Sequence, residues 1–219
     1  MEQKYYKHVR FYPWIGTHYE DGLNGVMVLI LGESHYCKEG ENSQKSRHQC
    51  PPGVCAECYM DEECHNKTKD TIKELWEGKW NKSQNTQRAF EKNVRGKRLT
   101  REEEIYFWEH VAFYEYIQYS QPKPRHPLRS GNIDYNIESF LEVINILRPD
   151  RIIIWGKRFY HLLIETFGGK INIDLQNERA LYWQLEYGTI VIPVLIVDHP
   201  CAPLGKKTSI WNPTIIKFF

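Results

Sequence analysis

The sequence predicts an α/β fold, a three-layer sandwich around a central, largely parallel sheet of four strands. Short hydrophobic runs of strand length, such as residues 26–31 ("VMVLIL") and 151–156 ("RIIIWG"), alternate with longer amphipathic segments. The 219 residues suffice for one full core, and no internal repeat is visible. We therefore expect a single domain over residues 1–219, with a cysteine-rich insertion at residues 37–66.

The first strand, residues 26–31, runs into Gly32, Glu33, Ser34, His35 and Tyr36 ("GESHY"). An apolar run that breaks into polar residues is typical of a central strand followed by a loop. In open α/β sheets, ligands bind at the carboxyl ends of such strands. This motif is therefore a candidate site.

Residues 68–80 follow the insertion and form a predicted helix with Ile72, Leu75 and Trp76 on one face. Residues 100–119 ("TREEEIYFWEHVAFYEYIQY") are expected to form one apolar helix, because Thr100 and Glu103 have capping-box spacing. Three prolines make residues 121–132 a loop.

The C-terminal third alternates between the two kinds of element. Residues 136–148 are expected to form an amphipathic helix before Pro149, with four inward residues: Phe140, Leu141, Ile144 and Leu147. Residues 151–156 form a short buried strand, and residues 157–169 a helix that ends at two glycines. Residues 179–200 are typical of a hairpin whose second strand is central.

Composition excludes few functions. The formal net charge of +1 is compatible with a local basic face, so it neither supports nor excludes nucleic-acid binding. No apolar stretch has the length of a signal-peptide core or a membrane span. We expect a cytoplasmic, monomeric protein without a membrane partner.

Four of the six cysteines, Cys50, Cys55, Cys58 and Cys64, lie within fifteen residues. In a reducing compartment, close cysteines indicate a metal site rather than disulfides. Zinc is the first expectation, and an iron–sulfur cluster is the alternative because the spacing of the first three also occurs in [2Fe–2S] loops. Cys37, His48 or His65 could replace one ligand, and free thiols in a surface loop remain possible.

Basic residues gather in a polar stretch after the first helix, and a further pair occurs near the C-terminus. They are expected to bind DNA phosphates in a salt-dependent way, although a solvated helix face is the alternative. The residues are Arg88, Lys92, Arg95, Lys97, Arg98, Lys206 and Lys207.

Three strand ends carry the motifs that show a resemblance: "GESHY", Trp155-Gly156, and His199-Pro200 in "VLIVDHPCAPL". In order and spacing they resemble the motifs of the uracil-DNA glycosylase superfamily, over most of residues 26–204. The resemblance implies a monofunctional DNA glycosylase that hydrolyses the N-glycosidic bond of a flipped-out base, either uracil or a cytosine-type base.

The first motif departs from the family pattern. Where the best-known branch has Gly-Gln-Asp-Pro-Tyr, this chain has Ser34 at the aspartate position, and a serine cannot act as a carboxylate base. Another branch uses a glutamate that Glu33 matches, and that branch carries an iron–sulfur cluster. His35 could also act as the base, or could simply cap the loop.

The resemblance also suggests other residues for the pocket. Glu115 stands where the family has a base-reading asparagine, and an ionised carboxylate, which only accepts hydrogen bonds, would suit the amino group of cytosine. Pairing of Glu115 with Arg125 or Arg129 outside any pocket is the alternative.

His199 would donate a hydrogen bond to the leaving base, and Glu33 would stabilise the sugar cation. The remaining pocket residues carried over from the family are Gly32, Ser34, Tyr36, Pro200, Cys201 and the wedge Leu204. Two other functions stay open: a non-catalytic nucleic-acid-binding relative, and a hydrolase of nucleosides or nucleotides.

Overall fold

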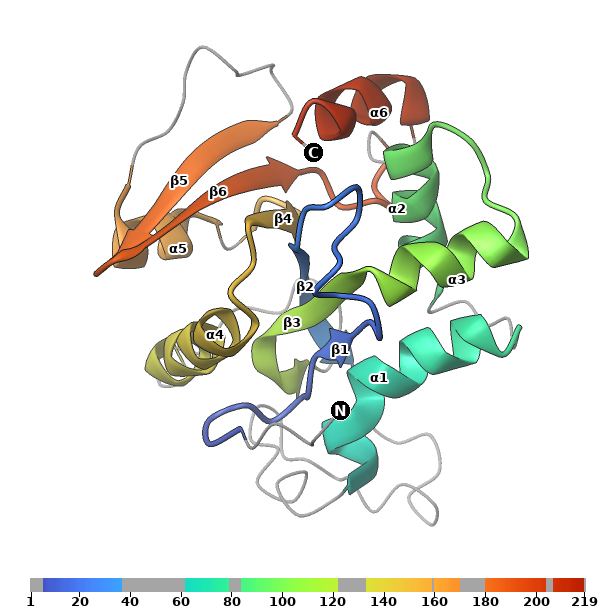
Figure 1. Cartoon of the computed structure of the whole chain (residues 1–219). Coiled ribbons are helices and arrows are strands. Elements are labelled where there is room, and N and C mark those ends of the chain that lie inside the picture. Colours follow the sequence, from blue (N-terminus) through green and yellow to red (C-terminus); the bar gives the residue numbers. More distant parts are fainter. Residues whose placement is uncertain are drawn as a thin grey trace. The chain divides into compact units, whose positions relative to one another are not determined.

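The structure is a computed structural model that describes residues 6–36, 62–78, 84–121, 133–158, 160–169, 180–203 and 207–218. Within these residues the protein is α/β, with a mixed six-stranded sheet and six helices (Figure 1). The elements in chain order are β1 (Trp14–Ile15), β2 (Val28–Tyr36), α1 (Glu62–Trp76), α2 (Asn85–Arg95), α3 (Arg101–Glu109), β3 (Val111–Gln121), α4 (Ile133–Leu147), β4 (Arg151–Trp155), α5 (Tyr160–Phe167), β5 (Leu181–Tyr187), β6 (Ile190–Val197) and α6 (Thr208–Ile216).

The sheet has the strand order β1-β3-β2-β4-β6-β5. Strands β2, β4 and β6 are parallel, with Val28 opposite Arg151 and Ile152 opposite Val194. Strand β5 pairs antiparallel with β6, as a hairpin requires. The α/β class, the parallel core and the hairpin with an internal second strand are therefore confirmed.

The predicted number of four strands is wrong, because β1 and β3 were not expected. β1 has two residues, too few to show any periodicity. β3 was assigned to the helix over residues 100–119, but α3 ends at Glu109 and the chain continues as a fully buried strand. Aromatic and β-branched residues dominate "VAFYEYIQY", and these residues favour a pleated sheet over a helix.

The expected boundary of the first strand is also wrong. β2 continues to Tyr36, so "GESHY" forms the end of the strand and not a loop after it. Because side chains alternate across a strand, Glu33 and His35 share one face of β2 and Ser34 lies on the other.

The predicted helices are otherwise confirmed. In α1, Ile72 and Leu75 are buried, and in α4, Phe140, Ile144 and Leu147 are buried while Leu141 is only half-buried. The Thr100–Glu103 capping box is present at the start of α3: Thr100 Oγ1 accepts from the Glu103 amide, and the Glu103 carboxylate accepts from the Thr100 amide. This cap fixes where α3 begins.

The chain divides into two compact units. The first contains Met1–Trp14, Glu33–Asp70 and Tyr114–Arg148. Here the amino-terminal segment is held by side chains of β3 and α4. Gln118 Oε1 accepts from the amides of Arg10 and Phe11, at 2.8 and 2.9 Å, and Glu142 accepts from the amides of Lys7 and His8.

The second unit contains Ile15–Gly32, Thr71–Phe113 and Pro149–Phe219. Its core includes the carboxyl-terminal residue of β4, Trp155, whose ring packs 4.9 Å from Phe90 and 5.0 Å from Phe113. Figure 1 shows β5 and β6 as a hairpin beside β4.

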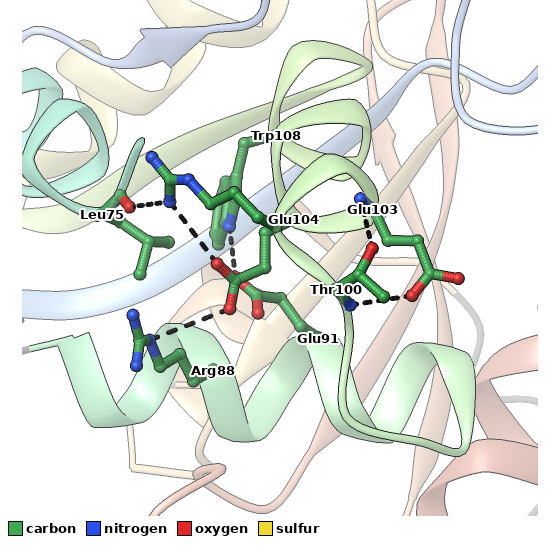
Figure 2. Close-up of polar contacts among 8 residues, drawn as sticks. Leu75, Arg88, Glu91, Thr100, Glu103, Glu104 and Trp108 are labelled. Atoms are coloured by element: carbon green, nitrogen blue, oxygen red, sulfur yellow. Dashed lines mark hydrogen bonds and ion pairs between the residues drawn. The ribbon is translucent and has the colours of Figure 1, made fainter. Parts of the chain in front are cut away.

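A buried polar cluster joins α2 to α3 in the second unit (Figure 2). The Trp108 indole N–H donates to Glu91 Oε1 at 2.6 Å. Glu104 lies 4.0 Å from Arg88 Nε and 3.5 Å from Arg101 Nη1. Burial raises the pKa of Glu91 to about 8, and the neighbouring Glu104 adds to this, while the Trp108 hydrogen bond and the two arginines oppose it. At neutral pH Glu91 therefore keeps its proton.

Candidate functional site

Glu115 is the most unusual ionisable group in the first unit. Strand β3 places it inside the fold, where only 8% of it is exposed. The pKa of Glu115 is raised to about 8, mainly by burial and also by the nearby Glu33 charge, while Lys67 opposes the shift. Two carboxyl groups and one ammonium therefore form an electrostatically coupled cluster, in which Glu115 is protonated at neutral pH.

Protonation changes what Glu115 can recognise. A carboxylate only accepts hydrogen bonds, whereas a carboxylic acid also donates one. Glu115 Oε2 is buried and has no hydrogen-bond partner among the described residues. With a pKa of about 8, Glu115 is an acceptor-only carboxylate above that pH and also a donor below it, and its role in reading a base stays a prediction.

His35 lies in the same unit and is buried against α1. Its Nε2 lies 2.7 Å from Thr68 Oγ1, and its ring meets the Phe11 ring edge-on at 4.9 Å. Burial, reinforced by the Lys67 charge, lowers the pKa of His35 well below its usual value, so the imidazole is neutral. These contacts fix the ring in the fold, and its role as a base remains a prediction.

The other residues of the motif differ in accessibility. Ser34 is buried, and its Oγ has no hydrogen-bond partner among the described residues. Tyr36 is 40% exposed, and its carbonyl accepts from Lys67 Nζ at 2.9 Å. Gly32 is buried near the middle of β2. Only Glu33 and Tyr36 in this motif are partly or largely open to solvent.

The structure adds two residues to this cluster that the sequence did not indicate: Lys67 and Thr68, both on α1. The Lys67 charge lowers the pKa of both Glu115 and His35, and its Nζ donates to the Tyr36 carbonyl. Thr68 is fully buried against His35. No local motif marks either residue, since both belong to an ordinary polar helix segment, "NKTKD".

His199 belongs to the second unit and follows the end of β6. The Cys201 backbone N–H donates to His199 Nδ1 at 3.2 Å. A nitrogen that accepts a hydrogen bond carries no proton, so the neutral imidazole has its proton on Nε2. The backbone of the turn thus makes Nε2 the donor atom of His199. A second bond, from the Ala202 N–H to the His199 carbonyl at 2.8 Å, closes the turn.

The carboxyl ends of β4 and β6 meet beside His199, as expected. The Gly156 N–H donates to the Val197 carbonyl at 2.8 Å. Gly156 has φ +91°, and a Cβ there would lie 3.8 Å from His199 Cβ. Lys157 and Asp198 pair at 3.5 Å. Glycine therefore gives the Trp155-Gly156 turn the left-handed backbone that lets it approach the histidine.

The rest of the "HPCAPL" segment is only partly described. Pro200 is buried, and Cys201 Sγ lies 3.2 Å from Thr86 Oγ1 on α2. Leu204 and Lys206 lie outside the described residues, so the wedge role of Leu204 stays a prediction.

The basic residues divide into two groups. Three are engaged within the second unit: Arg88 with Glu104, Lys97 with Glu103 at 2.7 Å, and Arg95 over the Tyr106 ring. The other three described residues are exposed at the surface: Lys92, Arg98 and Lys207. The exposed group has the accessibility that phosphate binding needs.

The metal prediction falls almost entirely outside the described residues. This holds for Cys50, Cys55 and Cys58, and also for the side chain of Cys64, whose backbone lies in the first turn of α1. Arg125 and Arg129 are outside them as well. Within the described ranges, no three or more His, Cys, Asp or Glu side chains come together as metal ligands would.

Comparison with known proteins gives no relative: no family model matches the chain, and no curated protein matches it either. Among the described residues, no helix is both long and apolar enough to cross a membrane.

Proposed function

We propose that the protein is a DNA glycosylase that hydrolyses the N-glycosidic bond of a base flipped out of the duplex. The observation that carries this proposal is the hydrogen bond from the Cys201 N–H to His199 Nδ1. It leaves the proton on Nε2, which suits His199 to stabilise a leaving base that gains negative charge. A histidine with the opposite tautomer could not donate from that atom.

Glu33 supplies the other half of the chemistry. Breaking the bond builds positive charge on the sugar, and a carboxylate stabilises that charge and orients the attacking water. Glu33 is partly exposed near the end of β2, and its charge acts on Glu115. A partly exposed carboxylate can meet a substrate, whereas the neighbouring His35 is buried against Phe11 and Thr68.

Glu115 is proposed to read the base. In its protonated form it offers one donor and one acceptor, which matches the carbonyl and imide N–H of uracil. In its ionised form it offers acceptors only, which suits the exocyclic amine of a cytosine-type base. Its unpartnered Oε2 supports a reading role, because a buried polar group without a partner is costly unless a ligand satisfies it.

The proposal has further parts, some implied by the family resemblance and some predicted from the residues and composition of the sequence. Tyr36 would wall the pocket, and Leu204 would fill the space left by the flipped base. Lys92, Arg98 and Lys207 would contact phosphates. The fold would be a three-layer sandwich, and the cysteine insertion would hold a structural zinc or an iron–sulfur cluster. The protein would act as a cytoplasmic monomer.

The test is base release by the wild type and by His199→Ala, across duplexes that carry uracil or modified cytosines. His199→Ala should lower the excision rate by about 10²- to 10³-fold, the usual value of one such donor. Wild-type binding to the duplex without base release would instead indicate a non-catalytic nucleic-acid-binding protein. Release from free nucleosides or nucleotides, with no binding to duplex, would indicate a nucleoside or nucleotide hydrolase.

A further inference from the structure

Three aromatic rings form an exposed column in the second unit: His18, His110 and Tyr106. The rings of His18 and His110 are 5.3 Å apart and within 17° of parallel. The rings of His110 and Tyr106 are 4.0 Å apart at 31°. On the side of Tyr106 the column continues with Arg95, whose guanidinium lies 6.0 Å from the ring centre.

The column is held at the surface of the unit. The His18 side chain is 54% exposed, and Tyr106 is 45% exposed. His110 packs against one face of the His18 ring, so a base can stack on this ring only from the opposite face. Among the described residues, most Phe, Trp and Tyr side chains are buried instead, including Phe107 and Trp108 on the same helix. Single exposed rings are ordinary, whereas exposed apolar groups that lie together on the surface indicate an interaction site.

The stacked rings are not needed to hold the segment around His18 in place. The segment around His18 is already fixed by two backbone hydrogen bonds, from the Gly16 N–H to the Val111 carbonyl at 3.1 Å and from the His18 N–H to the Glu109 carbonyl at 2.8 Å. At Gly16 the backbones approach so closely that a Cβ would lie 2.1 Å from the Glu109 carbonyl oxygen. The rings therefore stack on a backbone that other contacts hold in place.

Two side-chain hydrogen bonds orient the rings. His18 Nδ1 lies 3.0 Å from Asp21 Oδ2, and His110 Nδ1 lies 2.7 Å from the Tyr106 carbonyl oxygen. A carbonyl oxygen only accepts, so His110 donates from Nδ1. Rings that are oriented before a ligand arrives lose little freedom when it stacks on them.

The charge around the column is mixed but includes basic residues suited to a polyanion. Lys92 is one turn from Arg95 on α2, and both Lys92 and Arg98 are exposed. The Glu103 carboxylate is paired with Lys97 at 2.7 Å. Two exposed carboxylates weaken the positive field: Glu102, one turn from Tyr106 on α3, and Asp21, which pairs with the His18 ring. Stacking, more than charge, must then supply the recognition.

We propose that the column formed by His18, His110 and Tyr106 binds the unpaired bases of single-stranded nucleic acid by stacking. Stacked aromatic side chains beside basic residues are how proteins hold single strands without reading their sequence. This site goes beyond the proposed excision of one base, because it would engage bases outside the catalytic pocket, and it stands whether or not the protein is a glycosylase.

Fluorescence anisotropy of two labelled strands of equal length tests the proposal, one with thymine bases and one in which every site is abasic. His18→Ala should weaken binding of the thymine strand by about 5- to 100-fold, the range expected for one stacked base. Tyr106→Ala removes the ring that supports His110 and should weaken this binding to a smaller extent. Neither variant should change the weaker binding of the abasic strand. Tyr106→Phe keeps the ring and should bind like the wild type.

The matched control is Tyr187→Ala on β5, because Tyr187 is 47% exposed and lies outside the column. Thermal unfolding checks that each variant is folded, and His18→Ala keeps the test valid if Tyr106→Ala is unstable. Equal losses for Tyr187→Ala and Tyr106→Ala, equal losses on the abasic strand, or unchanged thymine-strand binding by both column variants would overturn the proposal. Base release from a duplex is measured separately, so its absence would reject the glycosylase and leave this result intact.

Discussion

At the scale of single residues, the proposed role of Glu115 in reading a base depends on its protonation. The residue type is visible in the sequence, but its proton depends on burial in β3 and on the charge of Glu33. Because the pKa is raised to about 8, Glu115 offers a donor and an acceptor below that pH and acceptors alone above it. The base that fits should therefore change with pH.

Replacing Glu115 by glutamine tests this role. In the wild type, uracil excision should fall as pH rises through about 8, because ionised Glu115 loses its donor. Glu115→Gln keeps a donor and an acceptor at every pH, so this fall should disappear while excision near pH 7 persists. Single-turnover excision between about pH 6.5 and 9.5 measures the effect.

Glu102→Gln on α3 is the control, since it removes an exposed carboxylate. It should keep the wild-type pH profile. A Glu115→Gln variant with the same fall as the wild type would place the titrating group elsewhere and exclude Glu115 as the base reader.

For single residues, the sequence indicated which side chains are candidates for the site, but not their protonation, their tautomer or their neighbours in the fold. Glu33 and His199 could be chosen because each follows a hydrophobic run within a motif of the family that the chain resembles, and Glu115 because it stands where that family has an asparagine. The tautomer of His199 could not be predicted from the sequence, because it depends on the backbone N–H of Cys201, two residues further along the turn. Lys67 and Thr68 could not be predicted as part of the site either, since only the packing of α1 in the folded protein brings them close to His35 and Glu115.

At the scale of elements, the boundary between α3 and β3 is the clearest difference from the sequence prediction. The capping box correctly marks the start of α3, because capping is a local interaction. The end of α3 has no glycine or proline, so nothing local separates it from the apolar run that becomes β3. Pairing within the sheet, a non-local interaction, turns that run into a strand.

The cluster that joins α2 to α3 makes stability depend on pH (Figure 2). The folded-state pKa of Glu91 is about 8, and its unfolded value is near 4.5. Between these values the folded state holds more protons than the unfolded state, so stability falls as pH rises. The slope is at most about 1.4 kcal/mol per pH unit for one such group.

Glu91→Gln should remove this contribution. The amide cannot ionise, and its carbonyl still accepts from the Trp108 indole. Urea unfolding at pH 5 and at pH 8 should show a smaller loss of stability in the variant than in the wild type, while Glu102→Gln should behave as the wild type. An identical pH dependence in wild type and Glu91→Gln would mean that Glu91 is already ionised in the folded protein.

At the scale of the whole molecule, the sequence predicted the class of the fold because parallel strands that alternate with helices have a strong pattern. Residues 28–31 of β2, 152–155 of β4 and 194–197 of β6 are continuous apolar runs, which is typical of strands buried on both faces. The number of strands was underestimated because β1 is too short and β3 too apolar to be recognised.

The cysteine insertion is expected to contribute to the stability of the chain through a bound metal. Cys55→Ser should lower the amount of zinc or iron per chain and lower the midpoint of thermal unfolding, since binding energy in such sites is folding energy. Elemental analysis of anaerobically purified protein, with an absorption spectrum to detect a cluster, measures this. Cys201→Ser should keep the metal content. Wild-type protein without stoichiometric zinc or iron would exclude the site.

The central claim is that the chain breaks the bond between base and sugar with Glu33. The most direct test is single-turnover base release by wild type and Glu33→Gln from the best duplex of the panel, with duplex binding measured in the same buffer. The account predicts equal binding and a rate lower by about 10²-fold or more, because glutamine removes the charge but not the size. Base release that is unchanged in Glu33→Gln would contradict it.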